Sequence, residues 1–258
     1  MPRGISRYDE ARLQGQLLTP EICAVRLRGD LRLWYNADHL TLDGSGLVEA
    51  AEDLTGQGND GSQTTAANRL NHYPEDPMHG CRASFGSSSY TGNRNLVMGS
   101  WEWAVGDDVF MSVNYKDGID STFDVYSFFI CGPGGYGEQR CMGTASNNTL
   151  YSGGSSWTND VAKNGNPSVS NVILPLPTSV CRFVCDAYKS SEIHYLMGHP
   201  SRADRDLEGT CRNVVVANTS LSVDKRQLIE GVLAWDSGIG ADLVADHPFV
   251  NRPPLIGD

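Results

Sequence analysis

Short runs of apolar and aromatic residues, several of them alternating with polar ones, recur along most of the chain. Residues 31–35 read Leu-Arg-Leu-Trp-Tyr, and residues 109–113 and 125–130 are rich in β-branched and aromatic side chains. Such runs predict β-strands, because successive side chains of a strand point to opposite faces of a sheet. Strands are expected at 31–35, 95–101, 109–115, 123–131, 180–187, 193–198 and 211–217.

One late segment has the spacing of a helix instead. Its apolar stripe is formed by Leu228, Ile229, Val232, Leu233 and Trp235. Ser222 is a suitable N-cap and Gly238 a suitable end, so a helix is predicted over 222–237. Three prolines after it predict an extended tail over 241–258.

Many strands followed by a single helix predict an all-β fold and argue against alternating βαβ units. We expect a two-sheet antiparallel jelly-roll sandwich in one domain, 30–258, which includes the helix and the tail. Residues 1–29 are interpreted as an N-terminal arm, in which Thr19-Pro20-Glu21 marks a short helix. Without this arm the domain is expected to remain folded. The segments 71–80 and 132–170 are rich in Gly, Pro, Ser and Asn and are expected to be mostly surface loops, with at most one short hairpin.

Composition and charge exclude some classes of partner. The 258 residues carry a formal net charge of -11, whereas nucleic-acid binding needs clustered Lys and Arg. No apolar run approaches the roughly 20 residues that a membrane span needs. The charged first residues do not resemble a signal peptide, so the chain is expected to be made in a cytoplasm. No nucleic-acid or membrane partner is therefore predicted.

The seven cysteines have no paired zinc-ligand spacing. They are interpreted either as small buried apolar residues or as disulfide partners formed after release into an oxidising medium. Cys131 and Cys141 flank a glycine-rich segment and are the candidate disulfide across a hairpin. Cys181 and Cys185 are too far apart along one strand to bridge each other.

Three blocks of sequence resemble one known superfamily. They are Leu33-Trp34-Tyr35-Asn36-Ala37-Asp38, the loop from Asp53-Leu54-Thr55-Gly56 to Asn68-Arg69, and Ile229-Glu230-Gly231-Val232-Leu233-Ala234-Trp235 followed by Asp246-His247-Pro248-Phe249 and Pro253-Pro254. In this order they resemble laminin-G-like domains of the concanavalin A-like lectin/glucanase superfamily, over roughly 31–254. The resemblance implies the jelly-roll sandwich.

The leader Gly4-Ile5-Ser6-Arg7-Tyr8-Asp9-Glu10 and onward resembles the start of bacteriophage virion-associated proteins that carry this domain. This likeness implies a non-enzymatic virion structural protein, either a capsid decoration or a neck or tail fibre module. Arg7, Tyr8 and Leu13 would anchor the arm. The implied partners are the major capsid protein or neck and tail proteins, with the chain itself forming homo-oligomers. The implied location is the virion.

Carbohydrate binding is the alternative function, with host-surface glycans as ligands. Such a site needs aromatic platforms beside polar groups, and the candidates are Trp101, Trp103, Tyr151 and Trp157. Trp101 and Trp103 also fit the inner face of the sandwich, whereas Tyr151 and Trp157 lie in the polar segment expected to form loops.

Glycoside hydrolysis is the less favoured reading, because it requires two carboxylates across the scissile bond. The chain has no ExDxE strand motif and no GxSxG elbow. The nearest acidic group is Asp117, Asp120 and Asp124 beside Asp107 and Asp108. The expectation is therefore that the protein is not an enzyme.

Calcium is the one cofactor that the sequence suggests. Asp38, Asp43, Asp53 and Asp60 could bring several oxygens to one loop cluster, as calcium requires. The alternative is that these aspartates accept hydrogen bonds from backbone N–H groups in turns.

Overall fold

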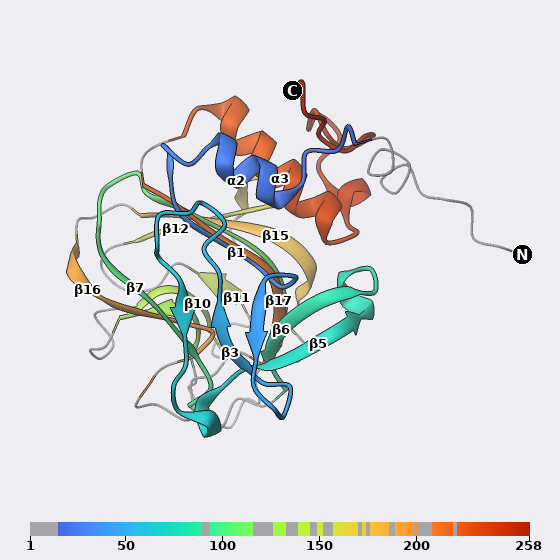
Figure 1. Ribbon diagram of the computed structural model, residues 1–258. Helices are drawn as coiled ribbons and strands as arrows, with labels where there is room; N and C mark the ends of the chain where they lie inside the picture. The colour runs from blue at the N-terminus through green and yellow to red at the C-terminus, as the bar shows by residue number, and fades with distance from the viewer. Residues whose placement is uncertain are drawn as a thin grey trace, which may run out of the picture.

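The computed structural model describes residues 15–88, 93–115, 126–132, 139–144, 149–151, 157–169, 172–173, 176–185, 189–198, 200, 208–218 and 221–258. The chain forms two stacked β-sheets with a helical layer on one of them (Figure 1). All the strand pairs described within the two sheets are antiparallel. This architecture confirms the predicted all-β two-sheet sandwich.

Sheet I has the strand order β13-β12-β15-β8-β17-β6-β5, with β1 also paired to β17. Its strands are β1 (Leu31–Asn36), β5 (Asn71–Asp76), β6 (Arg82–Ser87), β8 (Asp108–Tyr115), β12 (Trp157–Lys163), β13 (Asn166–Val169), β15 (Leu176–Cys185) and β17 (Gly209–Ala217).

Sheet II has the order β14-β11-β10-β9-β16-β7-β4-β3-β2. Its strands are β2 (Leu40–Leu42), β3 (Val48–Ala51), β4 (Gly61–Ser62), β7 (Leu96–Trp103), β9 (Tyr126–Cys131), β10 (Gln139–Thr144), β11 (Thr149–Tyr151), β14 (Val172–Ile173) and β16 (Lys189–Leu196).

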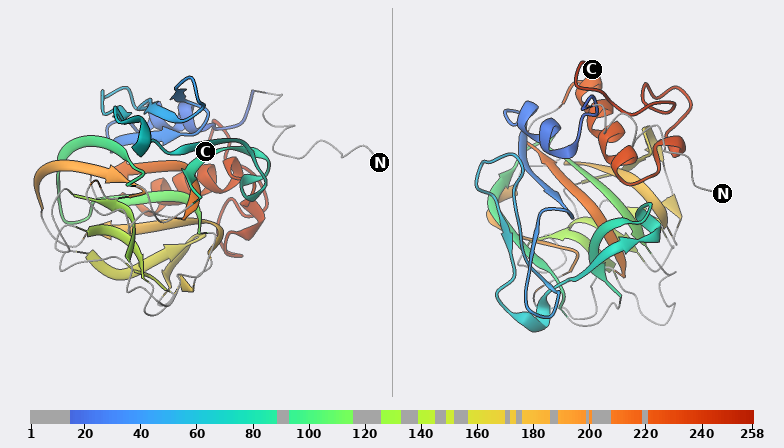
Figure 2. Two further views of the ribbon diagram at one scale, coloured as in Figure 1. Left: turned by 90° about the horizontal axis from the view of Figure 1, so that it is seen from below. Right: turned by 45° about the vertical axis from the view of Figure 1, so that its right-hand side comes forward.

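The helical layer covers the outer face of sheet I, as two further views show (Figure 2). It contains α2 (Pro20–Arg26), α3 (Val223–Asp236) and the C-terminal tail. Helix α3 matches the predicted helix: the Ser222 hydroxyl accepts a hydrogen bond from the Lys225 N–H, and Gly238 takes the left-handed conformation at φ +77°. Three short 3₁₀ turns complete the elements: η1 (Ala66–Asn68), η2 (Pro77–His79) and η4 (Gly240–Asp242).

Sheet I separates two apolar cores, and the alternation of its side chains shows why. On β8, Val109, Met111 and Val113 point into the core between the sheets, whereas Phe110 points into the core beneath the helices. Residues Val214 and Val215 of β17 divide in the same way. A strand covered on both faces has to be apolar at both parities, which explains the near-continuous apolar runs in these two segments.

Two segments predicted as loops contain strands. Residues 71–80 form β5 and η2, and residues 132–170 contain β10, β11, β12 and β13. Strand β5 is at the end of sheet I and contains Pro74, which an edge strand tolerates because one side of it forms no ladder. Strands β5 and β13 are at the two edges of sheet I, and edge strands need few apolar residues, so composition does not distinguish them from loops. Strands β10, β11 and β12 lie inside their sheets, and there the Gly, Ser and Asn content of the whole segment outweighed the short strand runs.

Residues 15–29, the described part of the N-terminal arm, pack against the domain. Leu18, Cys23, Ala24 and Leu27 are buried in the core beneath the helices. Leu17 forms an antiparallel bridge with Leu255, and the Leu18 N–H donates to the Pro254 carbonyl at 3.0 Å. Residues 15–29 are therefore part of the folded body. The bridge holds the N-terminal segment beside the C-terminal tail, where Figure 1 shows them together.

The C-terminal block that resembles laminin-G-like domains forms one set of contacts. The Trp235 indole N–H donates to the Phe249 carbonyl at 2.7 Å. Gly231 lies against the Phe249 ring, where a Cβ atom would come within 2.6 Å of a ring carbon. The His247 Nε2 atom of the tail lies 3.4 Å from a carboxylate oxygen of Glu230, which is on α3 with Gly231 and Trp235. The residues of this block therefore hold the tail against α3.

A buried ion pair ties α3 to sheet I. The Arg212 guanidinium on β17 donates to both carboxylate oxygens of Asp236, with its Nε at 2.8 Å and one terminal nitrogen at 3.1 Å. It also donates to the Ala83 carbonyl at 2.7 Å and to Asp38 at 2.6 Å. Asp236 accepts further bonds from Asn213 at 2.9 Å and Asn36 at 3.1 Å. Burial alone would raise the pKa of Asp236, but Arg212 and these hydrogen bonds outweigh it and lower the pKa.

Replacing Asp236 tests this ion pair. Asp236→Asn removes the buried counter-charge of Arg212 and leaves only the half-exposed Asp38 carboxylate beside it. We therefore expect a loss of about 2–4 kcal/mol in the free energy of unfolding, measured with urea. Asp242→Asn changes an exposed carboxylate in η4 and serves as the matched control, with less than about 0.5 kcal/mol expected. Equal stability of the two variants would contradict a structural role for the pair.

Candidate functional site

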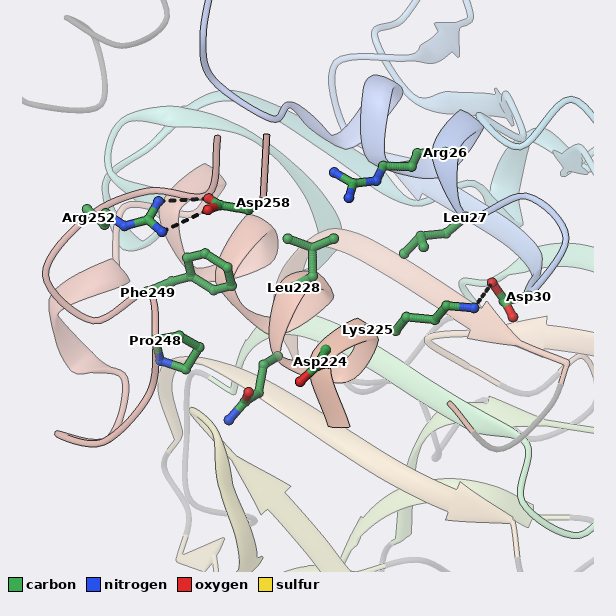
Figure 3. A pocket seen from close by; sticks show the side chains of 11 residues that line it. Arg26, Leu27, Asp30, Asp224, Lys225, Leu228, Pro248, Phe249, Arg252 and Asp258 are labelled. Carbon is green, nitrogen blue, oxygen red and sulfur yellow. Dashed lines mark hydrogen bonds and ion pairs between the residues drawn. The ribbon is translucent and has the colours of Figure 1, made fainter. Parts of the chain in front are cut away.

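One concave surface lies between the two helices and the tail, and we call it the terminal groove. It has a volume of about 530 Å³, and Figure 3 shows its lining. Leu27, Leu228 and Phe249 are its buried apolar members. Its charged members are largely paired with one another: Lys225 contacts Asp30 at 2.7 Å, and Arg252 holds both oxygens of Asp258 at 2.7 and 2.8 Å.

The backbone pairing around Leu17 and Leu255 places residues 16–18 at the rim of this groove. The Ile256 N–H donates to the Gln16 carbonyl at 2.9 Å, and Asp258, two residues further, lines the groove. Arg26 also lines it and donates to the Ile256 carbonyl at 3.4 Å. The terminal groove thus lies next to residues 15 and 16, where the described part of the chain starts.

A second concave surface lies at the end of sheet I where the β5–β6 hairpin folds over it. We call it the β5–β17 pocket, and its volume is about 610 Å³. Its lining is Tyr73, Glu75, Asp76, Pro77, Met78, Ser87, Ser88, Asn114, Tyr115, Leu176, Pro177, Gly209 and Thr210. Aromatic and apolar walls with a few polar groups are typical of small-molecule sites.

A network of hydrogen-bonded polar side chains joins four strands at this pocket. The Thr210 hydroxyl donates to Asp76 at 2.6 Å and accepts from the Asn114 amide at 2.5 Å. Asp76 also accepts from the Ser84 hydroxyl at 2.7 Å and from the Met78 N–H at 2.9 Å. The residues come from β5, β6, β8 and β17, and these contacts hold them in place.

Sequence reasoning missed this pocket because its residues are scattered over more than 130 positions. One signal was present: Ser112 and Asn114 are the polar side chains of an otherwise apolar, fully buried strand after its first residue. A polar residue at such a position must find a partner. The sequence could not show that this partner is Thr210.

The tryptophans proposed for sugar stacking are in the core. Trp101 is 5% exposed and Trp103 0%, and their rings meet edge to face with centroids 5.4 Å apart. Both also contact the His194 ring. The core interpretation is therefore correct for Trp101 and Trp103, and the binding interpretation is wrong. Tyr151 is in β11 and Trp157 in β12, so these two residues belong to strands of different sheets instead of a shared loop.

The four aspartates proposed for calcium are not brought together as a ligand set. Asp38 pairs with Arg212, and Asp43 pairs with Arg69 at 2.7 Å. Asp53 accepts hydrogen bonds from the Trp34 and Thr55 N–H groups, and Asp60 accepts one from the Asp53 N–H. Among the described residues, no group of three or more His, Cys, Asp or Glu side chains is placed to hold a metal ion. Asp53 instead links the two sequence blocks that contain Trp34 and Thr55, because its carboxylate accepts hydrogen bonds from both.

The proposed disulfide between Cys131 and Cys141 is absent. In the pairing of β9 with β10, Cys131 lies opposite Gln139 and Cys141 opposite Ile130. The Cys131 side chain is a buried thiol that donates to the Gly198 carbonyl at 3.2 Å. Cys23 and Cys181 are also buried thiols, and burial raises the pKa of each to about 12. The interpretation of cysteines as small buried apolar residues is correct for these three.

The remaining candidates divide between described and undescribed residues. Arg7, Tyr8 and Leu13 of the arm, and Asp117, Asp120 and Asp124 of the acidic group, lie outside the residues that the structure describes. Asp107 and Asp108 are described and buried; Asp107 precedes β8 and Asp108 is its first residue, and neither lines the terminal groove or the β5–β17 pocket. In the part of the chain described here, no helix has the length and apolarity to span a membrane.

Asp108 is a buried carboxyl group beneath α3. Burial raises its pKa to about 6, although Arg182 and Arg226 oppose the shift. The folded state therefore holds a proton more tightly than the unfolded chain, and the free energy of unfolding falls as pH rises from about 4 to about 6.

Asp108→Asn removes this cost. We expect the variant to be more stable than the parent at pH 7 by on the order of 1–3 kcal/mol, and equal to it at about pH 3.5, where both side chains are neutral. Urea unfolding at the two pH values measures the difference. A variant that is less stable at pH 7 would show that the ionised carboxylate stabilises the fold.

Comparison with known proteins gives few matches. No family model matches the chain, and no curated protein matches it. Solved structures that resemble it include Trypanosoma rangeli sialidase in complex with sialic acid, at 15% identity and a TM-score of 0.46. The same enzyme in complex with the inhibitor DANA gives 12% identity and a TM-score of 0.44.

These alignments cover 81% and 76% of this chain, but only 33% and 32% of the sialidase chains. This chain thus spans about a third of the length of those proteins. The expectation that the protein is not an enzyme is contradicted by these matches to enzymes and is withdrawn. At these TM-scores and identities, the matches do not establish sialidase activity for this chain.

Proposed function

We propose that this chain is a structural module on a bacteriophage particle, either a capsid decoration or part of a neck or tail fibre. Its N-terminal segment docks it to the major capsid protein or to neck and tail proteins, and copies of the chain assemble as a homo-oligomer. The identity of the particle rests on the leader, which resembles the start of bacteriophage virion-associated proteins; the three sequence blocks resemble the laminin-G-like domain that such proteins carry.

The observation that carries the docking proposal is the antiparallel bridge between Leu17 and Leu255. It holds residues 15–18, the first that the structure describes, beside the tail and at the rim of the terminal groove. A short segment held in this way can join a module to an assembly without disturbing its core. The groove beside it offers a second contact surface for the same partner.

Deleting residues 1–14 tests the proposal. Among the described residues, the first buried core side chains are Leu17 and Leu18. We therefore expect the shortened protein to fold with unchanged stability but to be lost from purified particles. Mass spectrometry of the particles measures incorporation. A variant in which a Gly/Ser segment of equal length replaces residues 1–14 distinguishes the effect of the segment's sequence from the effect of its length. Incorporation of the deletion variant at the parental copy number would contradict the docking role.

Carbohydrate binding is the second candidate function, and the β5–β17 pocket favours it. The pocket combines the Tyr73 ring with the hydrogen-bonding groups of Ser87, Asn114 and Thr210, which is the composition of a sugar site. Host-surface glycans would be the ligands of a particle-bound adhesin. This pocket replaces Trp101 and Trp103 as the proposed platform.

Tyr73→Ala tests this second function. Loss of a stacking ring is expected to weaken glycan binding by about tenfold, measured by calorimetry with the best glycan from a panel. Tyr195→Ala on β16 alters a partly buried tyrosine of the other sheet and should leave binding unchanged. Absence of binding across the panel would exclude the adhesin function.

A further inference from the structure

Among the residues that the structure describes, the charges that line the β5–β17 pocket are all of one sign. Glu75 and Asp76 contribute two carboxylates, and this described lining includes no Lys or Arg. Glu75 is exposed, whereas Asp76 is buried. A concave site with low-dielectric walls strengthens the field of such charges and selects ligands by sign.

Asp76 remains ionised at neutral pH. Burial would raise its pKa, but hydrogen bonds from Ser84, Thr210 and the Met78 N–H outweigh burial and lower it. His79, beneath the pocket, does not cancel this charge, because burial lowers the pKa of the imidazole to about 4 and leaves it neutral at pH 7. The nearby Arg212 guanidinium is already held by Asp38 and Asp236.

The walls suit a ring that carries hydroxyl groups. Tyr73, Pro77 and Leu176 provide apolar surface, and Ser87, Asn114 and Thr210 provide donors and acceptors near the carboxylates. An alkyl amine such as a lysine side chain would use the charge and the apolar wall but not these hydroxyl and amide groups. A sugar ring uses all three features.

We infer that the β5–β17 pocket binds an amino sugar, with its ammonium group beside Glu75 and Asp76 and its ring against Tyr73. This inference rests on the proposed carbohydrate-binding function and names the class of sugar. It also implies that acidic sugars bind poorly, because a sugar carboxylate would meet two like charges without a basic partner among the described lining residues.

The experiment compares sugars that differ in charge, using the full chain and isothermal titration calorimetry. The probes are a glucosamine tetramer, its N-acetylated form, sialyllactose and a lysine amide. We expect the glucosamine tetramer to bind about tenfold more tightly than its N-acetylated form, and the preference to fall as salt rises from about 20 to 500 mM. Sialyllactose should not bind.

Two variants assign the preference to the pocket. Glu75→Gln should reduce the preference for the glucosamine tetramer over its N-acetylated form about threefold. The affinity for the neutral N-acetylated form should change little, because the substitution removes the exposed carboxylate and keeps the shape of the side chain. Glu102→Gln is the matched control, an exposed glutamate on β7 in the other sheet, and should leave the preference intact.

The outcomes are distinguishable. Equal or tighter binding of the N-acetylated tetramer would overturn the charge inference and leave carbohydrate binding in place. Binding of the lysine amide as tightly as the glucosamine tetramer would overturn the assignment to a sugar. No binding of any sugar would overturn both this inference and the carbohydrate-binding function.

Discussion

The buried pair between Arg212 and Asp236 is the interaction on which the arrangement of this molecule depends. Arg212 is on the central strand β17, and Asp236 is the last residue of α3. The guanidinium also reaches β6 through the Ala83 carbonyl, while Asn36 of β1 donates to Asp236. Because an unpaired charge buried away from water costs several kcal/mol, the pair holds the end of α3 in one position on sheet I.

The position of α3 determines where the ends of the chain lie. Gly231 and Trp235 hold Phe249, so the tail folds back over the helix, and the tail in turn pairs with Leu17. Residues that are far apart in sequence thus form the third layer of the sandwich. The docking role proposed for the N-terminal segment uses this layer, because the first described residues pair with the tail at Leu17 and Leu255.

The two concave surfaces have different physical character. The terminal groove pairs its own charges, Lys225 with Asp30 and Arg252 with Asp258, and so presents an apolar floor with a balanced rim. In the described part of its lining, the β5–β17 pocket has two carboxylates and no basic residue. We propose the first surface for a protein partner and the second for a small polar ligand of opposite sign. A particle-bound adhesin would use both.

The sequence by itself determined the central strands, helix α3 and the two-sheet class. Periodicity and capping are local properties, and the runs at 109–115 and 211–217 and the Ser222 cap express them directly. The tertiary structure alone decided which polar residues meet. Asp38 pairs with Arg212 across 174 positions, and Thr210 meets Asp76 across 134. Strand order and register set such contacts, and one-dimensional patterns do not encode the partner of a side chain. For the same reason Trp101 and Asp53 were open to a binding role in the sequence, whereas in the fold Trp101 is core and Asp53 holds a loop.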